Sequence, residues 1–90
     1  MKLIRNCSIE GKGKYILINR QKNNSIEYGF PNTKEEFFVI KLKDKYAQAA
    51  LNAYVMAVQD DPDGDQEYAK QILELANRSG RDNQWCKKPT

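Results

Sequence analysis

The feature that most constrains the fold of this chain is a single change in the spacing of its apolar residues near Asp44. Before Asp44 the apolar side chains alternate with polar ones, as in strands. After it they recur every three to four residues, as in helices. Strands followed by helices predict an α+β fold, in which an antiparallel β-meander of three to four strands precedes two helices packed on one face of the sheet.

The strands are expected in four segments. Ser25–Phe30 alternates most clearly, with Ile26, Tyr28 and Phe30 on one face. We expect it to pair antiparallel with Lys14–Arg20 across the polar loop of residues 21–24, which has the chemistry of a hairpin connection. Phe37–Lys43 forms the predicted third strand, and Lys2–Ile9 forms a weaker fourth.

Two helices are expected after the strands. Asp44 is a suitable N-cap for the first, which should run to Gln59 with an apolar stripe of Ala47, Ala50, Leu51, Tyr54, Val55 and Val58. The second should begin after Asp63 or Asp65 and end at Gly80, burying Tyr68, Ala69, Ile72, Leu73 and Ala76. We therefore predict a single domain over residues 1–90, with a sheet part (1–43), a two-helix part (44–80) and a polar tail (81–90).

The sequence offers little for catalysis. It contains no histidine, which excludes histidine-based triads and removes the commonest general base and metal ligand. Cys7 and Cys86 are expected to be free thiols, with a disulfide between them as the alternative. We accordingly predict a protein that is not an enzyme and that binds no cofactor and no metal.

An acidic stretch at residues 60–67 superficially matches the alternating ligands of a calcium loop. Counted from Asp61, however, the sixth and twelfth positions hold Gln66 and Ile72, where an EF-hand needs glycine and glutamate. The prediction is a solvated turn between the helices in which an aspartate caps the second one.

The predicted sheet has more apolar surface than two short helices can cover, because Phe37 and Val39 alternate out of register with Phe38 and Ile40. Either the tail covers the second face through Trp85, or that face is exposed and binds a partner protein or a second copy of the chain. The predicted contact residues are Phe37, Val39, Lys41, Lys43 and Trp85.

The uneven distribution of charge along the chain allows nucleic acid as an alternative partner. Residues 1–45 hold ten Lys or Arg against five acids, whereas residues 46–90 hold five against seven. The basic half, with Tyr15, Phe37 and Trp85 as residues on which bases could stack, is the basis for the alternative prediction of a DNA- or RNA-binding regulator. No apolar run is long enough to span a bilayer, and the charged start does not resemble a signal peptide, so we expect a cytoplasmic protein without a membrane partner.

The C-terminal half resembles known proteins of one genomic setting. The segments FFVIKLKDKYAQAALNAYVMAVQ, EYAKQILELANRSG and WCKKPT are similar to small uncharacterised proteins encoded by bacteriophages and prophages. The resemblance carries no catalytic motif and assigns no functional residue. It implies an accessory role in the host cytoplasm, such as blocking a host defence protein as anti-CRISPR proteins do. The expected function is that of a small binding protein that inhibits its partner by covering a surface.

Overall fold

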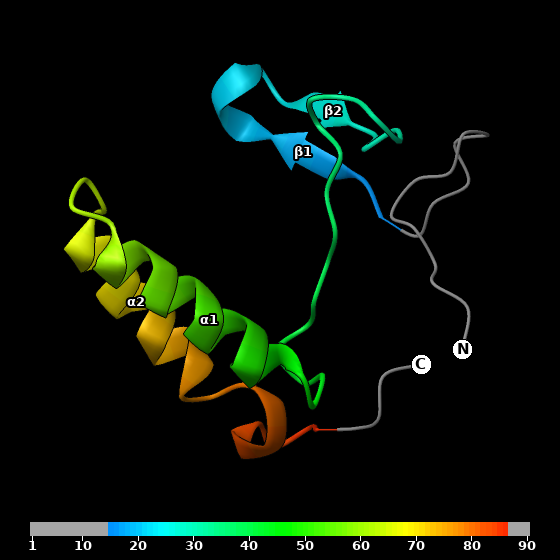
Figure 1. The fold of residues 1–90 in the computed structure, drawn as a ribbon. Coiled ribbons are helices and arrows are strands. Elements are labelled where there is room, and N and C mark those ends of the chain that lie inside the picture. The colour runs from blue at the N-terminus through cyan, green and yellow to red at the C-terminus, as the bar shows by residue number, and fades with distance from the viewer. Residues whose placement is uncertain (1–14, 87–90) are drawn as a thin grey trace. The chain divides into compact units, whose positions relative to one another are not determined.

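A computed structural model describes residues 15–86 of the chain. Contacts divide the chain into two compact units, Met1–Val39 and Ile40–Thr90, which are described one at a time. The described residues form a two-stranded antiparallel sheet and two α-helices, as expected of an α+β chain (Figure 1). The prediction that these elements make one domain, with both helices on one face of the sheet, stays a prediction.

The first unit contains a hairpin. β1 (Leu17–Asn19) pairs antiparallel with β2 (Ser25–Glu27), so that Ile18 lies opposite Ile26. A 3-10 turn, η1 (Arg20–Lys22), connects them through two asparagines at positions 23 and 24, whose φ angles of 55° and 57° lie in the left-handed region that asparagine tolerates. The predicted pairing is confirmed, but each strand is only three residues long.

The prediction of a meander with three to four strands is wrong for the described residues, which contain two. Residues 37–41 have no regular secondary structure, and Leu42 and Lys43 lie in a turn. The carbonyl of Lys41 accepts from the backbone N–H of Asp44 at 3.0 Å, and that of Leu42 accepts from Gly80 at 2.8 Å. Alternating side chains do not suffice for a strand when the backbone bonds to a turn and a distant loop instead of a neighbouring strand. The segment Lys2–Ile9 lies outside the described residues.

Two antiparallel helices, α1 (Ala47–Asp60) and α2 (Gln66–Ala76), make up most of the second unit (Figure 1). Val55, Ala69 and Ile72 form the core between them, and Leu51 and Val58 pack against it. Tyr54, Tyr68 and Leu73, which the periodicity assigned to the core, are exposed. The contact is therefore narrower than predicted: only Val55, Ala69 and Ile72 are buried in it, and these longer side chains lie outside it.

The turn between the helices has the predicted role. The Asp65 carboxylate accepts from the backbone N–H of Tyr68 at 3.0 Å and caps α2. Asp61 accepts from the Asp63 N–H at 2.9 Å through its carboxylate and from the Gly64 N–H at 2.9 Å through its carbonyl. A side chain at Gly64 would collide with the Val58 carbonyl, so the tight connection requires glycine here.

Both outer helix boundaries differ from the prediction. α1 begins after Tyr46, and Asp44 instead accepts from the Tyr46 N–H at 2.8 Å in the preceding turn. α2 ends at Ala76, and Gly80 starts a short 3-10 helix, η2 (Gly80–Asp82). No helix within residues 15–86 is long and apolar enough to cross a lipid bilayer.

Replacing Ile72 with alanine should lower the free energy of unfolding of the helical unit by about 3 kcal/mol, because it leaves a cavity in a very small core. Leu73→Ala is the matched control, since this neighbouring side chain is 37% exposed against 7% for Ile72. It should cost less than half as much. Urea denaturation followed by circular dichroism measures both, and equal losses would contradict the packing described here.

Candidate functional site

The basic segment before α1 is fixed to the chain that follows α2. The Gly80 N–H donates to the Leu42 carbonyl at 2.8 Å, and Gly80 is buried with φ at 64°. A Cβ at Gly80 would lie only 2.9 Å from the Gln48 Cβ, so the two segments meet where no larger residue fits. This contact holds Lys41 and Lys43, on either side of Leu42, beside residues some forty positions later in the sequence.

Gln48 on α1 hydrogen-bonds to the end of α2 and to η2, close to Gly80. Its side-chain amide donates to the Ala76 carbonyl at 3.0 Å and to the Asp82 carboxylate at 2.8 Å. Ser79 is fully buried, and its hydroxyl donates to the Ala76 carbonyl at 2.8 Å. The Ala76 carbonyl at the end of α2, which also accepts from the Ser79 backbone N–H at 3.2 Å, thus has two side-chain donors in addition, and Gln48 attaches η2 to α1.

Asn83 fixes the turn that carries Trp85. Its side-chain amide donates to the Arg78 carbonyl at 3.0 Å, while its side-chain oxygen accepts from the Trp85 N–H at 2.9 Å. Its backbone N–H donates to Gly80 and its carbonyl accepts from Cys86, both at 3.0 Å. All four hydrogen-bonding positions hold the turn together, which makes Trp85 part of a defined structure.

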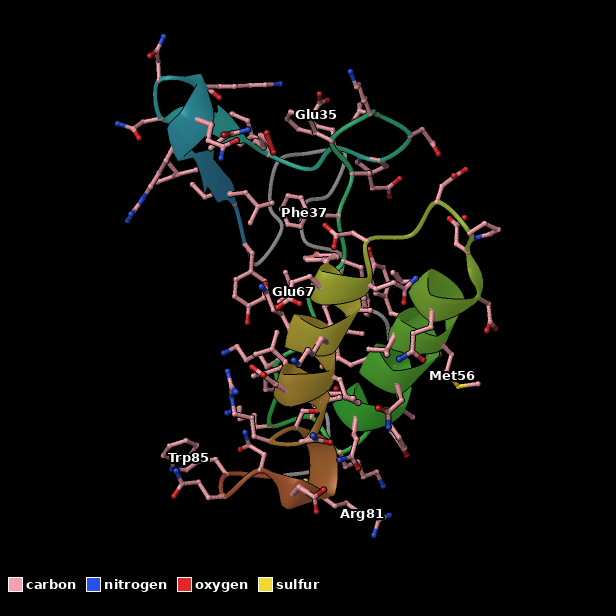
Figure 2. The ribbon with its side chains drawn as sticks, turned by 90° about the vertical axis from the view of Figure 1, so that its left-hand side faces the viewer. Glu35, Phe37, Met56, Glu67, Arg81 and Trp85 are labelled. Carbon is pink, nitrogen blue, oxygen red and sulfur yellow. The ribbon has the colours of Figure 1, made fainter. Side chains whose placement is uncertain are left out.

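These segments surround an open hollow of about 390 Å³, lined by Lys41, Leu42, Lys43, Asn83 and Trp85, which we call the Trp85 hollow. The Trp85 side chain is 64% exposed and projects outward beyond the C-terminal end of α2 (Figure 2). Two lysines, one aliphatic side chain and one indole therefore share a single surface depression. This set can bind an apolar or flat group together with negative charge, but it contains no nucleophile paired with a base.

The structure brings together three of the five predicted contact residues. Lys41, Lys43 and Trp85 line the hollow, whereas Phe37 and Val39 do not. Those two residues belong to the other compact unit, where both are half-buried and the Phe37 ring lies where a side chain at Gly29 would sit. Whether any of the five binds a partner stays a prediction.

Sequence reasoning missed Leu42 and Asn83. Leu42 was assigned to a strand face, and Asn83 was treated as part of a polar tail. A usable signal existed for Asn83, since asparagine two residues before an aromatic residue is compatible with an Asx turn, in which the side chain bonds to the backbone two residues on. No local pattern indicates that Leu42 pairs with Gly80.

Other candidate chemistry is accounted for by local structure. Asp61 and Asp65 of the acidic stretch make the turn and cap hydrogen bonds described above. Across residues 15–86, no group of three or more potential ligands could hold a metal ion. Cys86 is a half-buried free thiol, and Cys7 lies outside the described residues.

Comparison of this chain with known protein families, with curated proteins and with solved structures finds no match.

Changing Asn83 to alanine should release the Trp85 turn without unfolding the helices, because it removes two side-chain hydrogen bonds from an exposed loop. Trp85 is the only tryptophan, so time-resolved fluorescence anisotropy reports on it alone. We expect a larger fast component of depolarisation on the nanosecond scale. The neighbouring Gln84→Ala should leave the decay unchanged, and equal decays in both variants would contradict the role assigned to Asn83.

Proposed function

We propose that this chain is a small non-enzymatic binding protein that inhibits a partner protein by covering part of its surface, and that the Trp85 hollow makes the contact. The observation that carries the proposal is the fixed turn that holds an exposed tryptophan beside two lysines. The proposal extends the prediction from sequence, but it moves the contact from a sheet face to a hollow of the helical unit.

The energetics of tryptophan support a binding role. Burying its large apolar ring in a partner releases bound water from more surface than any other side chain, and tryptophan is enriched among residues that dominate interface affinity. A turn already fixed by Asn83 loses little conformational entropy on binding. Both effects favour Trp85 as the anchor of an interface.

The lysines indicate the charge of the partner. Lys41 and Lys43 are exposed and lie on the same hollow as Trp85. Opposite charge on a partner accelerates encounter and fixes orientation. The partner surface that fits is therefore an acidic one with an apolar or aromatic side chain at its centre.

The class of partner rests on the resemblance alone, which does not identify the target. Similarity of the C-terminal half to phage and prophage proteins implies a host defence protein as the target, reached in the host cytoplasm. The segments that carry the resemblance include Lys41, Leu42, Lys43 and Trp85 of the hollow, whereas Asn83 lies between two of them.

One alternative has its own support. Single-stranded nucleic acid is bound by aromatic side chains that stack on bases beside cations that contact phosphates, and Trp85 with Lys41 and Lys43 supplies one such position. The basic excess of residues 1–45 adds to this reading. One tryptophan is a small stacking platform, so we favour the protein partner.

The test is a comparison of variants against whichever host protein is retained from lysate by the immobilised chain. Trp85→Ala should weaken its binding about tenfold or more, as expected of an anchor residue, and Lys43→Glu should weaken it by reversing a charge at the hollow. Tyr68→Ala and Lys70→Glu are the matched controls, because both lie exposed on α2 outside the hollow. Binding that survives Trp85→Ala would remove the basis of the proposal.

Salt separates the two kinds of partner. A fluorescently labelled oligothymidylate should bind no more than weakly, whereas the protein partner should be retained when salt is raised from about 50 to 200 mM. Tight oligonucleotide binding that collapses over this range, and that also requires Trp85, would favour the nucleic-acid alternative.

A further inference from the structure

The side of α1 that faces away from α2 is almost entirely apolar. Seven exposed residues repeat at three- and four-residue spacing along it and form what we call the outer face of α1: Tyr46, Ala49, Ala50, Ala53, Met56, Ala57 and Asp60. They fall within a stripe about 120° wide, opposite the side that carries Leu51, Val55 and Val58. Met56 projects from α1 away from α2 (Figure 2).

This face is unusual for a helix exposed to water. No charged residue occurs from Ala47 to Gln59, although a surface helix normally carries charged or polar residues opposite its core stripe. Tyr46 and Met56 are each 61% exposed. The polar residues of this stretch, Gln48, Asn52 and Gln59, lie on one flank of α1, so the outer face holds none of them, and an apolar helix face is normally covered.

The charged residues at the two ends of α1 include several that interact unfavourably with the helix dipole. Lys43 and Lys45 precede the positive N-terminal end, whereas Asp60 and Asp61 lie at the negative C-terminal end. The first turn holds no acidic residue and the last turn holds no basic one. Within one copy of α1, no basic residue in the last turn offsets Asp60 and Asp61, and at the N-terminal end Asp44, which accepts from the Tyr46 N–H, stands against two lysines.

We propose that a second copy of this chain covers the outer face, with the two α1 helices antiparallel about a two-fold axis at Ala53. Lys45 is eight residues before Ala53, and Asp60 and Asp61 are seven and eight residues after it, so this register places Lys45 of one copy beside the acidic Asp60–Asp61 end of the other. It also places Tyr46 opposite Asp60 and Ala49 opposite Ala57. The same contact compensates both ends of both helices and opposes their dipoles.

A second copy fits better than an unrelated partner, because α1 itself carries the apolar and charged residues that the contact needs. The outer face needs an occupant that is apolar for about 21 Å, acidic at one end and basic at the other. In an isologous contact α1 itself has those properties in the required order. Alanines at the centre allow the close approach that dispersion contacts need.

The contact is small. A single helix face falls at the low end of specific interfaces, where association is weak. We therefore expect dimers at about micromolar concentrations and above, and monomers below that. This inference does not depend on the Trp85 hollow.

Analytical ultracentrifugation of the full chain over a concentration series tests the association. Ala53→Lys should raise the dimer dissociation constant about tenfold or more, because two lysines would meet at the axis. Asn52→Lys is the matched control, since it adds the same charge about 100° away on the same helix and should leave the constant within about threefold. Circular dichroism confirms that both variants fold.

Charge reversal tests the orientation. Lys45→Glu and Asp60→Lys should each weaken self-association, whereas the two single variants mixed together, or the double variant, should recover it because opposite charges then meet again. A chain that stays monomeric at millimolar concentration overturns the proposal. A dimer whose dissociation constant is unchanged by Ala53→Lys also overturns it. If the mixed or double charge-reversal variants do not recover self-association, the antiparallel register is wrong.

Discussion

The packing of α1 on α2 through Val55, Ala69 and Ile72 is the contact on which the rest of the helical unit depends. It sets the spacing of the two helices and thus brings Gln48 within reach of the Ala76 carbonyl. The hydrogen bond from Gly80 to Leu42 follows from the same alignment, since both residues lie just beyond helix ends. The Trp85 hollow therefore rests on a helix contact that none of its lining residues makes.

This dependence explains why polar residues are so prominent at the junction after α2. The chain reverses there with a buried Ser79 and a left-handed Gly80, and every buried backbone group must find a partner. Gln48, Ser79 and Asn83 provide those partners with side chains. A turn satisfied in this way can hold an exposed indole in place without burying any of it in the core.

The sequence predicts those features of the fold that depend on residues close together in the chain. The pairing across residues 21–24 depends on turn chemistry, and the helix period and an aspartate cap on α2 depend on neighbours within four residues. These predictions are confirmed, although the sequence alone leaves open whether Asp63 or Asp65 is the cap. The predicted strand at Phe37–Lys43 is wrong, because the alternation of its side chains gives no sign that the Leu42 carbonyl bonds to Gly80. For the same reason the sequence does not predict the hollow, although Lys41, Lys43 and Trp85 of its lining are among the predicted contact residues. Lysines and a tryptophan are visible as chemistry, while the contact that assembles them spans half the chain.

The outer face of α1 and the Trp85 hollow expose large apolar side chains, and this bears on the stability of the fold. Within residues 15–86, alanines supply three of the five buried apolar residues, while Tyr46, Met56 and Trp85 are more than 60% exposed. Soluble domains usually show the reverse, with large apolar residues inside. A core this small contributes little free energy, so the folded helical unit should have a narrow stability margin. Any partner that binds only the folded state adds to that margin by mass action. Association through the outer face of α1 or the Trp85 hollow would thus stabilise the fold as well as serve its function, which gives a physical reason why large apolar groups lie outside.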